Sequence, residues 1–332
     1  MTPRDVPSQS ETRHCVVKAK GGMGNRMLCA ASGLIWARAV GRACFVDWRD
    51  DAYSREGENS LFQFFDPPHA IRDPEGIDDQ SVEPAVWQGR LDMSPSKLFH
   101  EIDPAAHRSI SAHKRYSIDP RRSDHAARTV VFWHYMDQIH ASARVVGGVL
   151  PGYRGLGYTA MLSKALREEL PLRADLAEWV DRFAAEHFDR PTIGVHIRYS
   201  DRKAPVARCT EALRRLRQKL PDARVFLATD SRAVENDFKR EFGEVVVTEK
   251  WLPEPGEAAH QNPNCDDPVA NGVEALRDMM LLARCTGLVY ARRSTFSFVS
   301  HCVGSFERGM VIDVDRADPK IIARRLIRRL VA

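Results

Sequence analysis

A histidine and an arginine stand two residues apart at His196 and Arg198, near the carboxyl end of the apolar run TIGVHIR, residues 192–198. The run predicts a buried strand, and side chains two apart on a strand project to the same side. One face therefore carries an imidazole and a guanidinium together. The guanidinium is a fixed fork of N–H donors, which suits a pyrophosphate leaving group that gains negative charge. The same two residues, taken alone, are also typical of a core histidine and an exposed strand end.

A glycine-rich turn, GGMGNR at 21–26, is a second candidate site. It joins an apolar run to an Ala-rich helical stretch, and such a turn can point backbone N–H groups at an anion. The turn lacks the Lys-Ser/Thr of a P-loop, and Met27 stands where a dinucleotide fingerprint has its third glycine. The glycines are equally suited to letting helix and strand pack closely.

A third candidate lies between residues 278 and 298, DMMLLARCTGLVYARRSTFSF. The pattern predicts a helix, then a strand, then a Ser-Thr-Phe-Ser turn at 294–297 that opens another helix. Ser294 and Thr295 can cap that helix or give hydroxyl groups to a phosphate, and both roles are compatible.

These segments together resemble a known family. GG-x-GN after the first strand, H-x-R after a mid-chain strand, ATDS at 228–231, and LLARC followed by STFS are similar to three motifs of the α-1,2-, α-1,6- and protein O-fucosyltransferases. FVDWRD at 45–50 and ALRDMMLLARC at 275–285 resemble the rhizobial nodulation fucosyltransferases in particular. The resemblance covers most of the chain beyond the N-terminal arm, and residues 50–190 contribute little to it.

The resemblance implies an inverting, metal-independent glycosyltransferase that moves fucose from GDP-fucose to a sugar hydroxyl of an N-acetylglucosamine-containing oligosaccharide. It implies no cofactor besides the donor substrate. Arg198 would bind the β-phosphate and be catalytic, while His196 and Asp278 would lie near the guanine, whose ring N–H and amine a carboxylate can accept. The implied donor-binding residues are Gly22, Gly24, Asn25, Arg26, His196, Arg198, Asp230, Asp278, Ser294, Thr295 and Phe296.

The general base is left open by this resemblance. Tyr199 replaces the basic residue or histidine usual after H-x-R, and Val206 falls where some α-1,6 relatives have a glutamate. Asp201 is the catalytic candidate by position, and Asp230 is another, although carboxylates at strand ends are often turn or cap groups. A loose, oxocarbenium-like transition state would need no strong base, because stabilising the leaving group matters most.

The elements that must position these residues alternate between strands and helices, which predicts parallel sheets. We expect an α/β fold of the GT-B type, with two Rossmann-like doubly wound domains facing across a cleft. Asp267 and Pro268 predict the start of the helix that carries Asp278. Residues 50–128 lack periodicity and are predicted to be irregular. The expected strands cover residues 14–19, 43–48, 129–134, 192–198, 223–229, 244–248, 287–291 and 310–314.

The predicted domains are a flexible arm at 1–14, an acceptor-side domain at 15–188, and a GDP-sugar-binding domain at 189–332 that ends in a basic helix. The net charge of +4 is concentrated in the terminal segment 317–332, which argues against a nucleic-acid-binding face. Seven cysteines without a CxxC pair, and a polar N-terminus without an apolar core, favour a cytoplasmic protein without a membrane span.

Three rival functions share some of these residues. Asp47 closes the second strand as a ribose-binding acid would, which suggests a NAD-dependent oxidoreductase. A noncatalytic nucleotide- or glycan-binding protein could use the same scaffold. Asp313-Val314-Asp315 is a D-x-D sequence that a metal-dependent GT-A transferase would need, but it ends an apolar run late in the chain, so strand-terminal solvation is the simpler interpretation.

Overall fold

The computed structural model divides into two compact units, Met1–Arg173 and Ala174–Ala332. It describes residues 12–50, 52–55, 57–105, 113–201, 203–257, 262 and 264–316. The predicted terminal basic helix and most of the predicted arm lie outside these residues. The units divide 15 residues before the predicted boundary at 188, because helix α7 (Ala174–His187) packs against α10 (Pro268–Arg284) of the second unit.

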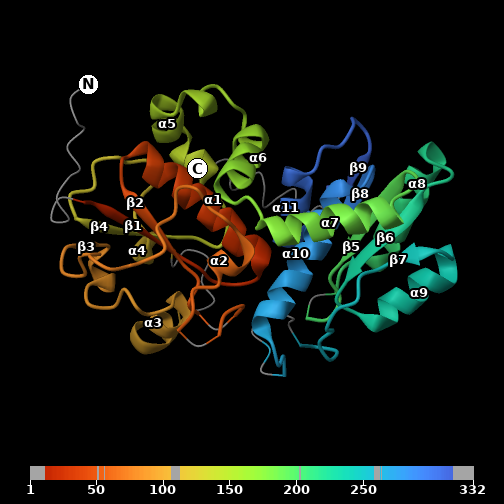
Figure 1. Ribbon diagram of the computed structural model, residues 1–332, viewed down its shortest axis with the longest axis horizontal. Coiled ribbons are helices and arrows are strands. Elements are labelled where there is room, and N and C mark those ends of the chain that lie inside the picture. The colour runs from red at the N-terminus through yellow and green to blue at the C-terminus, as the bar shows by residue number, and fades with distance from the viewer. Residues whose placement is uncertain are drawn as a thin grey trace. The chain divides into compact units, whose positions relative to one another are not determined.

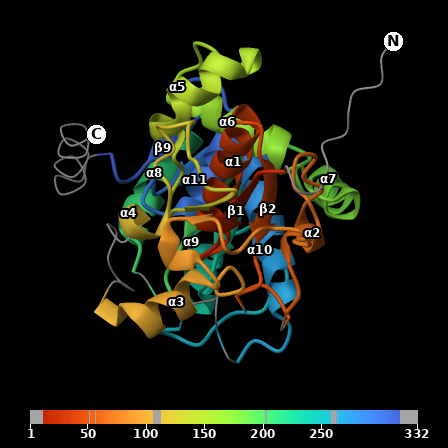
Figure 2. The same ribbon diagram turned by 90° about the vertical axis from the view of Figure 1, so that its left-hand side faces the viewer.

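The first unit is built on a parallel sheet of order β2-β1-β4-β3. Its strands are β1 (His14–Lys18), β2 (Ala43–Asp47), β3 (Val82–Glu83) and β4 (Thr129–Trp133). Helix α1 (Met23–Ala39) lies beside β1 and β2 in both ribbon views (Figures 1 and 2). The close approach of α1 depends on Gly33, where a β-carbon would come within 2.5 Å of Val17.

The remaining elements of the first unit are short. The segment 50–128, predicted as irregular, contains several of them, and α5 and α6 follow β4. Brief apolar patches such as Leu61–Phe64 form single helical turns that a periodicity argument misses. These elements are α2 (Leu61–Phe64), η1 (Ala85–Trp87), α3 (Pro95–Ile102), α4 (His113–Tyr116), α5 (Ile139–Val149), η4 (Pro151–Tyr153) and α6 (Tyr158–Glu169).

The second unit has a parallel sheet of order β7-β6-β5-β8-β9. The chain runs outward from β5 through β6 to β7, crosses back through α10, and continues from β8 to β9, so a topological switch point lies between β5 and β8. Its strands are β5 (Thr192–Ile197), β6 (Arg224–Thr229), β7 (Val245–Val246), β8 (Gly287–Tyr290) and β9 (Val311–Asp313). Its helices besides α7 and α10 are α8 (Val206–Lys219), α9 (Arg232–Phe242) and α11 (Thr295–Val303).

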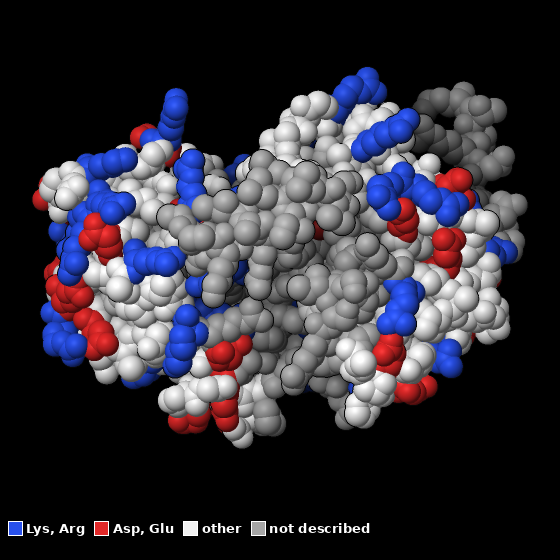
Figure 3. Space-filling model, turned by 180° about the vertical axis from the view of Figure 1, so that it is seen from behind, with Lys and Arg blue, Asp and Glu red and all other residues white. Residues whose placement is uncertain are grey.

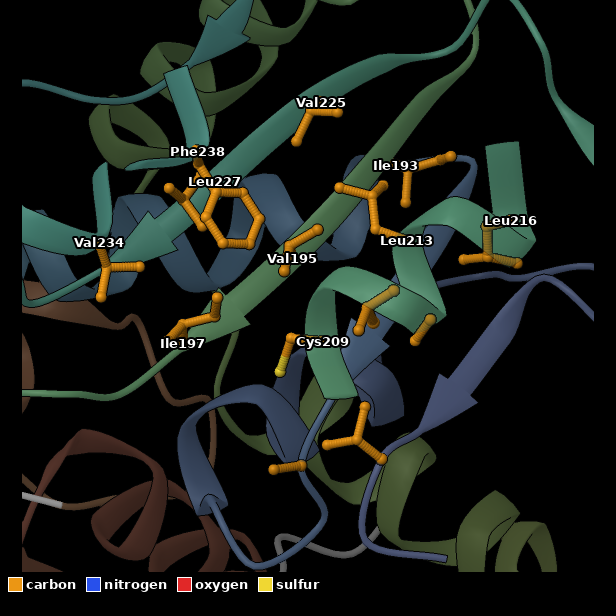
Figure 4. Packing of buried hydrophobic residues seen from close by; sticks show 14 of the residues in the cluster. Ile193, Val195, Ile197, Cys209, Leu213, Leu216, Val225, Leu227, Val234 and Phe238 are labelled. Carbon is orange, nitrogen blue, oxygen red and sulfur yellow. The ribbon is translucent and has the colours of Figure 1, made fainter. Parts of the chain in front are cut away.

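Alternate residues of β5 serve opposite faces of this sheet. Ile193, Val195 and Ile197 pack with residues of α8 and α9 in a fully apolar core (Figure 4). Gly194 faces α10, and a β-carbon there would lie 2.9 Å from the Cys285 sulfur. Because that face also carries His196, the helices opposite α8 and α9 are the ones that meet the candidate site.

Helix α10 begins where the sequence predicts. The Asp267 carboxylate accepts hydrogen bonds of 3.0 Å from the N–H groups of Val269 and Ala270, and Pro268 occupies the first turn. Asp278 follows three turns later on the buried side of the helix. The cap therefore fixes the register that brings Asp278 to the sheet.

No helix in the described part of the chain is both long enough and apolar enough to cross a membrane. On the face drawn in Figure 3, the Lys and Arg side chains lie intermingled with Asp and Glu side chains.

Candidate active site

The candidate site in the second unit lies at the carboxyl ends of β5 and β8. The two strands are neighbours in register, with Val195 opposite Val289. His196 is the next residue of β5, and the chain after β8 turns through residues 291–294 into α11. Open α/β sheets bind ligands at this switch point, since the loops there diverge and leave a crevice.

His196 is buried with 7% of its surface exposed, and its ring stacks on Phe296 with centroids 4.8 Å apart. Burial, followed by the positive charges of Arg198 and Lys250, lowers the His196 pKa to about 3. The imidazole is therefore neutral at physiological pH. Its Nδ1 atom is buried and has no hydrogen-bond partner among the described residues. Such an atom costs about 1–3 kcal/mol unless a ligand or water satisfies it.

Arg198 is held by Asp201, the residue that the sequence offered as general base. The Arg198 Nε and Nη2 atoms donate to the two Asp201 oxygens at 2.6 and 2.5 Å. Both side chains are about a quarter exposed. The bidentate pair fixes the plane of the guanidinium, so in this arrangement Asp201 orients Arg198.

Asp230 supports the loop that follows β5. One of its oxygens accepts from the N–H groups of Tyr199 at 2.6 Å and Ser200 at 3.0 Å, and the other accepts from the Ser200 hydroxyl at 2.7 Å. The sequence grouped Asp230 with the donor-binding residues, and the structure shows it holding the backbone that carries Arg198 and Asp201. This is a turn role of the kind carboxylates at strand ends often have.

The turn into α11 leaves polar groups open. Ser294 is the N-cap residue by position, yet its hydroxyl caps nothing, is buried, and has no partner among the described residues. The first-turn N–H groups of a helix have no intrahelical acceptor, and the Ser294 side chain accepts from none of those of α11. Capping of α11 by Ser294, one of the two roles that the sequence allows, does not occur in this structure.

The D-x-D carboxylates build this turn. Asp313 accepts from the Arg292 N–H at 3.1 Å, and the fully buried Asp315 accepts from the Arg293 N–H at 2.9 Å. They act on the backbone directly before Ser294. In the described part of the chain, no group of three or more His, Cys, Asp or Glu side chains is arranged to hold a metal ion.

Asp278 has two partners that the sequence did not indicate. Its buried carboxylate accepts from the Thr248 hydroxyl at 2.5 Å through one oxygen and from the Lys250 ammonium at 2.5 Å through the other. Thr248 and Lys250 follow β7 and are two residues apart, as expected for side chains on one side of an extended segment. The sequence did offer one signal for this pair, since Thr248 and Lys250 alternate directly after the apolar run at 245–247. It could not indicate Asp278 as their partner, because α10 is distant in the sequence.

A second carboxylate on α10 anchors the same segment. Glu274 lies one turn before Asp278 and accepts from the Trp251 N–H at 2.9 Å. Residues 248–251 are thus held to one face of α10 at three points. The charge of Lys250 also reaches His196, since it contributes to lowering the His196 pKa.

The polar groups of the glycine turn in the first unit form hydrogen bonds with neighbouring residues of the same unit. Helix α1 begins at Met23, inside the segment 21–26 that the sequence predicts as a turn, so Gly22 is its N-cap and Gly24 lies in its first turn. The Met23 N–H donates to the Tyr53 hydroxyl at 3.3 Å. The Asn25 amide donates to the Tyr135 carbonyl at 2.5 Å.

Arg26 has no exposed surface. Its Nε donates to the Gly21 carbonyl at 2.8 Å, its Nη2 pairs with Asp50 at 2.6 Å, and the guanidinium lies over the Trp48 and Tyr53 rings. One Arg26 nitrogen and one Asp50 oxygen have no partner in the described residues. The structure therefore shows Arg26 bound within the first unit.

Asp47 does not have the freedom that a ribose-binding acid needs. One of its oxygens pairs with the buried Lys18 ammonium at 2.6 Å, and Arg49 donates to both oxygens at 2.8 and 3.0 Å. Because its oxygens already serve Lys18 and Arg49, the carboxylate is an internal counter-ion. This arrangement argues against the oxidoreductase alternative.

Two parallel doubly wound sheets, one with polar groups gathered at its switch point, define an α/β protein of the GT-B fold class. The sequence profile of the family described as "Nodulation protein Z (NodZ)" matches residues 161–328, just over half of the chain. The chain belongs to this family.

Individual relatives agree with that assignment. Nodulation protein Z of Azorhizobium caulinodans is 26% identical over 325 residues, covering 86% of this chain and 88% of the relative. The crystal structure of NodZ α-1,6-fucosyltransferase co-crystallised with GDP is similar with a TM-score of 0.61 and 22% identity, over 89% of this chain and 93% of that one. The fucosyltransferase NodZ from Bradyrhizobium gives a TM-score of 0.60 and 21% identity, over 89% and 94%.

Proposed function

We propose that this chain is an inverting fucosyltransferase that uses GDP-fucose as donor and a sugar hydroxyl, on an N-acetylglucosamine-containing oligosaccharide, as acceptor. NodZ relatives of known structure were crystallised with GDP or soaked with GDP-fucose, which supports the choice of donor. We assign donor binding to the second unit and acceptor binding to the first. All seven cysteines are free, which supports a cytoplasmic enzyme.

The observation that carries the proposal is the set of open polar groups at the switch point of the second unit. The His196 Nδ1 atom and the Ser294 hydroxyl are buried and have no partner among the described residues, and the Ser294 side chain does not cap α11. A nucleoside diphosphate has acceptors for the hydroxyl, the helix N–H groups and the Arg198 guanidinium. Its base can occupy the region of His196 and Asp278, where a carboxylate suits guanine.

In the proposed reaction, the acceptor hydroxyl oxygen forms a bond to the anomeric carbon while the bond from that carbon to the β-phosphate oxygen breaks. GDP leaves with the electron pair, and attack from the opposite face inverts the anomeric configuration. Negative charge grows on the β-phosphate, where Arg198 and Ser294 would gain most from the transition state. The hydroxyl proton passes to a base or to solvent.

Both carboxylates considered as the base are engaged in this structure, Asp201 by Arg198 and Asp230 by the loop at Tyr199 and Ser200. This supports the third alternative, a loose oxocarbenium-like transition state in which leaving-group stabilisation replaces strong base catalysis. Under this proposal Asp201 is chiefly the residue that positions Arg198.

The test is GDP release from a panel of GDP-fucose, GDP-mannose and UDP-N-acetylglucosamine, with and without chitin oligosaccharides. We expect release from GDP-fucose to rise when the oligosaccharide is present, with a fucosylated product detected by mass spectrometry. Tight GDP binding without turnover on any acceptor would instead identify a noncatalytic nucleotide-binding protein. Preference for a different GDP-sugar would keep the donor site and change the sugar.

A further inference from the structure

We infer that Lys250 is a second residue that reads the donor base, and that it donates to the C6 carbonyl oxygen of guanine. This inference rests on the proposed function, because it takes GDP as the ligand of the second unit. It concerns a residue that the proposal above leaves without a role.

Guanine presents three groups in a row on one edge: the C6 oxygen, which accepts, then the ring N1–H and the 2-amino group, which donate. A carboxylate alone can accept from the two donors but offers nothing to the C6 oxygen. Asp278 alone would therefore leave the C6 oxygen without a hydrogen-bond donor. In a buried site, an unpaired carbonyl oxygen weakens binding and forfeits discrimination.

Lys250 supplies the missing donor at the right place. Its ammonium lies 2.5 Å from one Asp278 oxygen and carries three N–H donors, of which the ion pair uses one. The C6 oxygen of a guanine paired to Asp278 is adjacent to the N1–H that the carboxylate accepts. A cation already bonded to that carboxylate can thus bridge to the oxygen without leaving its partner.

The surroundings hold the ammonium in position. The Lys250 side chain is 12% exposed and the Asp278 side chain 5%, so the pair is shielded from water and is weakly screened. Thr248 fixes the other Asp278 oxygen at 2.5 Å, and Glu274 anchors the backbone at Trp251. The resulting row of one donor and two acceptors is complementary to guanine and mismatched to adenine, which has an amine at C6.

Two GDP analogues separate the contribution of Lys250 to guanine binding from that of Asp278. One has sulfur in place of the C6 oxygen, which weakens the acceptor that Lys250 would use. The other, inosine diphosphate, lacks only the 2-amino group that Asp278 would use. Calorimetry measures the affinity of the 332-residue chain and of its variants for GDP and for both analogues.

For the unmodified protein we expect the sulfur analogue to bind about tenfold more weakly than GDP, the effect of weakening one charge-assisted hydrogen bond. In Lys250→Met this ratio should fall to about one, while the ratio of GDP to inosine diphosphate stays as it was. Lys250→Arg, which keeps a cationic donor, should retain most of the tenfold ratio and covers the case in which Lys250→Met fails to fold.

Two control variants distinguish direct contact of Lys250 with guanine from an effect of Lys250 on Asp278 alone. Thr248→Val removes the other partner of Asp278 and should weaken GDP and the sulfur analogue by the same factor, leaving their ratio unchanged. Lys219→Met removes an exposed lysine of α8, which donates to the Gly309 carbonyl, and should change no nucleotide affinity. If Lys250 only supported Asp278, its removal would act like Thr248→Val.

A sulfur-to-oxygen ratio that stays near tenfold in Lys250→Met would overturn the assignment of Lys250 and leave the guanine preference, and so the proposed function, intact. Failure of the unmodified protein to prefer GDP over ADP would overturn both. The two failures are therefore distinguishable in one titration series.

Discussion

Each unit has a candidate turn that joins a strand to a helix, and the polar groups of the two turns have different partners. At the turn after β1, the Met23 N–H donates to the Tyr53 hydroxyl and the Arg26 cation pairs with Asp50, although one nitrogen of Arg26 and one oxygen of Asp50 have no partner among the described residues. At the turn after β8, the backbone is fixed by Asp313 and Asp315, while the Ser294 hydroxyl and the α11 start remain open.

The difference teaches that the more conspicuous motif need not form the more open site. Glycines make the first turn easy to recognise, and Gly21 there has a positive φ of 84°. The second turn has no glycine between Ala291 and Ser297, its backbone N–H groups at Arg292 and Arg293 donate to carboxylates, and its Ser294 hydroxyl has no partner among the described residues. The predictions below test this contrast.

The largest effect should follow from removing the Arg26 cation at the turn after β1. Arg26→Met leaves the Asp50 carboxylate buried without its cation, so we expect the free energy of unfolding to fall by about 3–5 kcal/mol in urea denaturation. Arg49→Met, which removes a quarter-exposed partner of Asp47, should cost about 1 kcal/mol or less. An Arg26 variant of normal stability that has lost GDP affinity would show that Arg26 binds the donor, as the sequence predicts.

The next largest effect is expected at Arg198, which follows β5, the strand beside β8. Arg198→Lys keeps the charge and loses the bidentate fork, and we expect kcat to fall by about 10²–10³ with stability little changed. Steady-state kinetics with GDP-fucose measures it, with Asp201→Asn measured in parallel. Near-normal turnover in Arg198→Lys together with loss of turnover in Asp201→Asn would mean that base catalysis dominates.

A smaller effect is expected from Ser294→Ala. Because the Ser294 hydroxyl caps nothing, its loss should leave thermal unfolding unchanged and weaken GDP binding by up to about tenfold, the scale of one neutral hydrogen bond. Ser94→Ala is the matched control, since the Ser94 hydroxyl caps α3 by accepting from the Lys97 N–H. It should cost about 1 kcal/mol of stability and no GDP affinity. The reverse pattern would make Ser294 an ordinary cap.

The smallest expected effect is that of a chelator. Because Arg198, Ser294 and the start of α11 supply donors for the pyrophosphate, we expect turnover in EDTA to equal turnover without it. Activity that EDTA abolishes and manganese restores would contradict this and return attention to Asp313 and Asp315.

Much of the fold was predictable because strands of a parallel sheet are buried on both faces and appear as short apolar runs. All eight predicted strands occur, and the family assignment is confirmed. The run at 244–248 shrinks to two paired residues, Val245 and Val246, and the two-residue strand β3 was not expected. Elements this short depend on neighbours that local sequence does not reveal.

The sequence proposes residues for the site, and it indicates little about their contacts. His196, Asp278 and Ser294 stand out by type and place, whereas the bond from Lys250 to Asp278 spans 28 residues and has no local signature. The burial of Arg26 was equally hidden, because nothing near Asp50 in the sequence marks it as a partner. Pairings of this kind follow from packing and require the structure.

The most direct test of the central claim is the affinity of the protein for GDP, ADP and UDP, measured by calorimetry beside Asp278→Ala. Because a carboxylate at Asp278 can accept from both donors of guanine, GDP should bind far more tightly than the other two. Asp278→Ala should lose about 1–3 kcal/mol of that preference. Equal affinity for the three nucleotides in the unmodified protein would contradict the assignment of a guanine nucleotide site to the second unit.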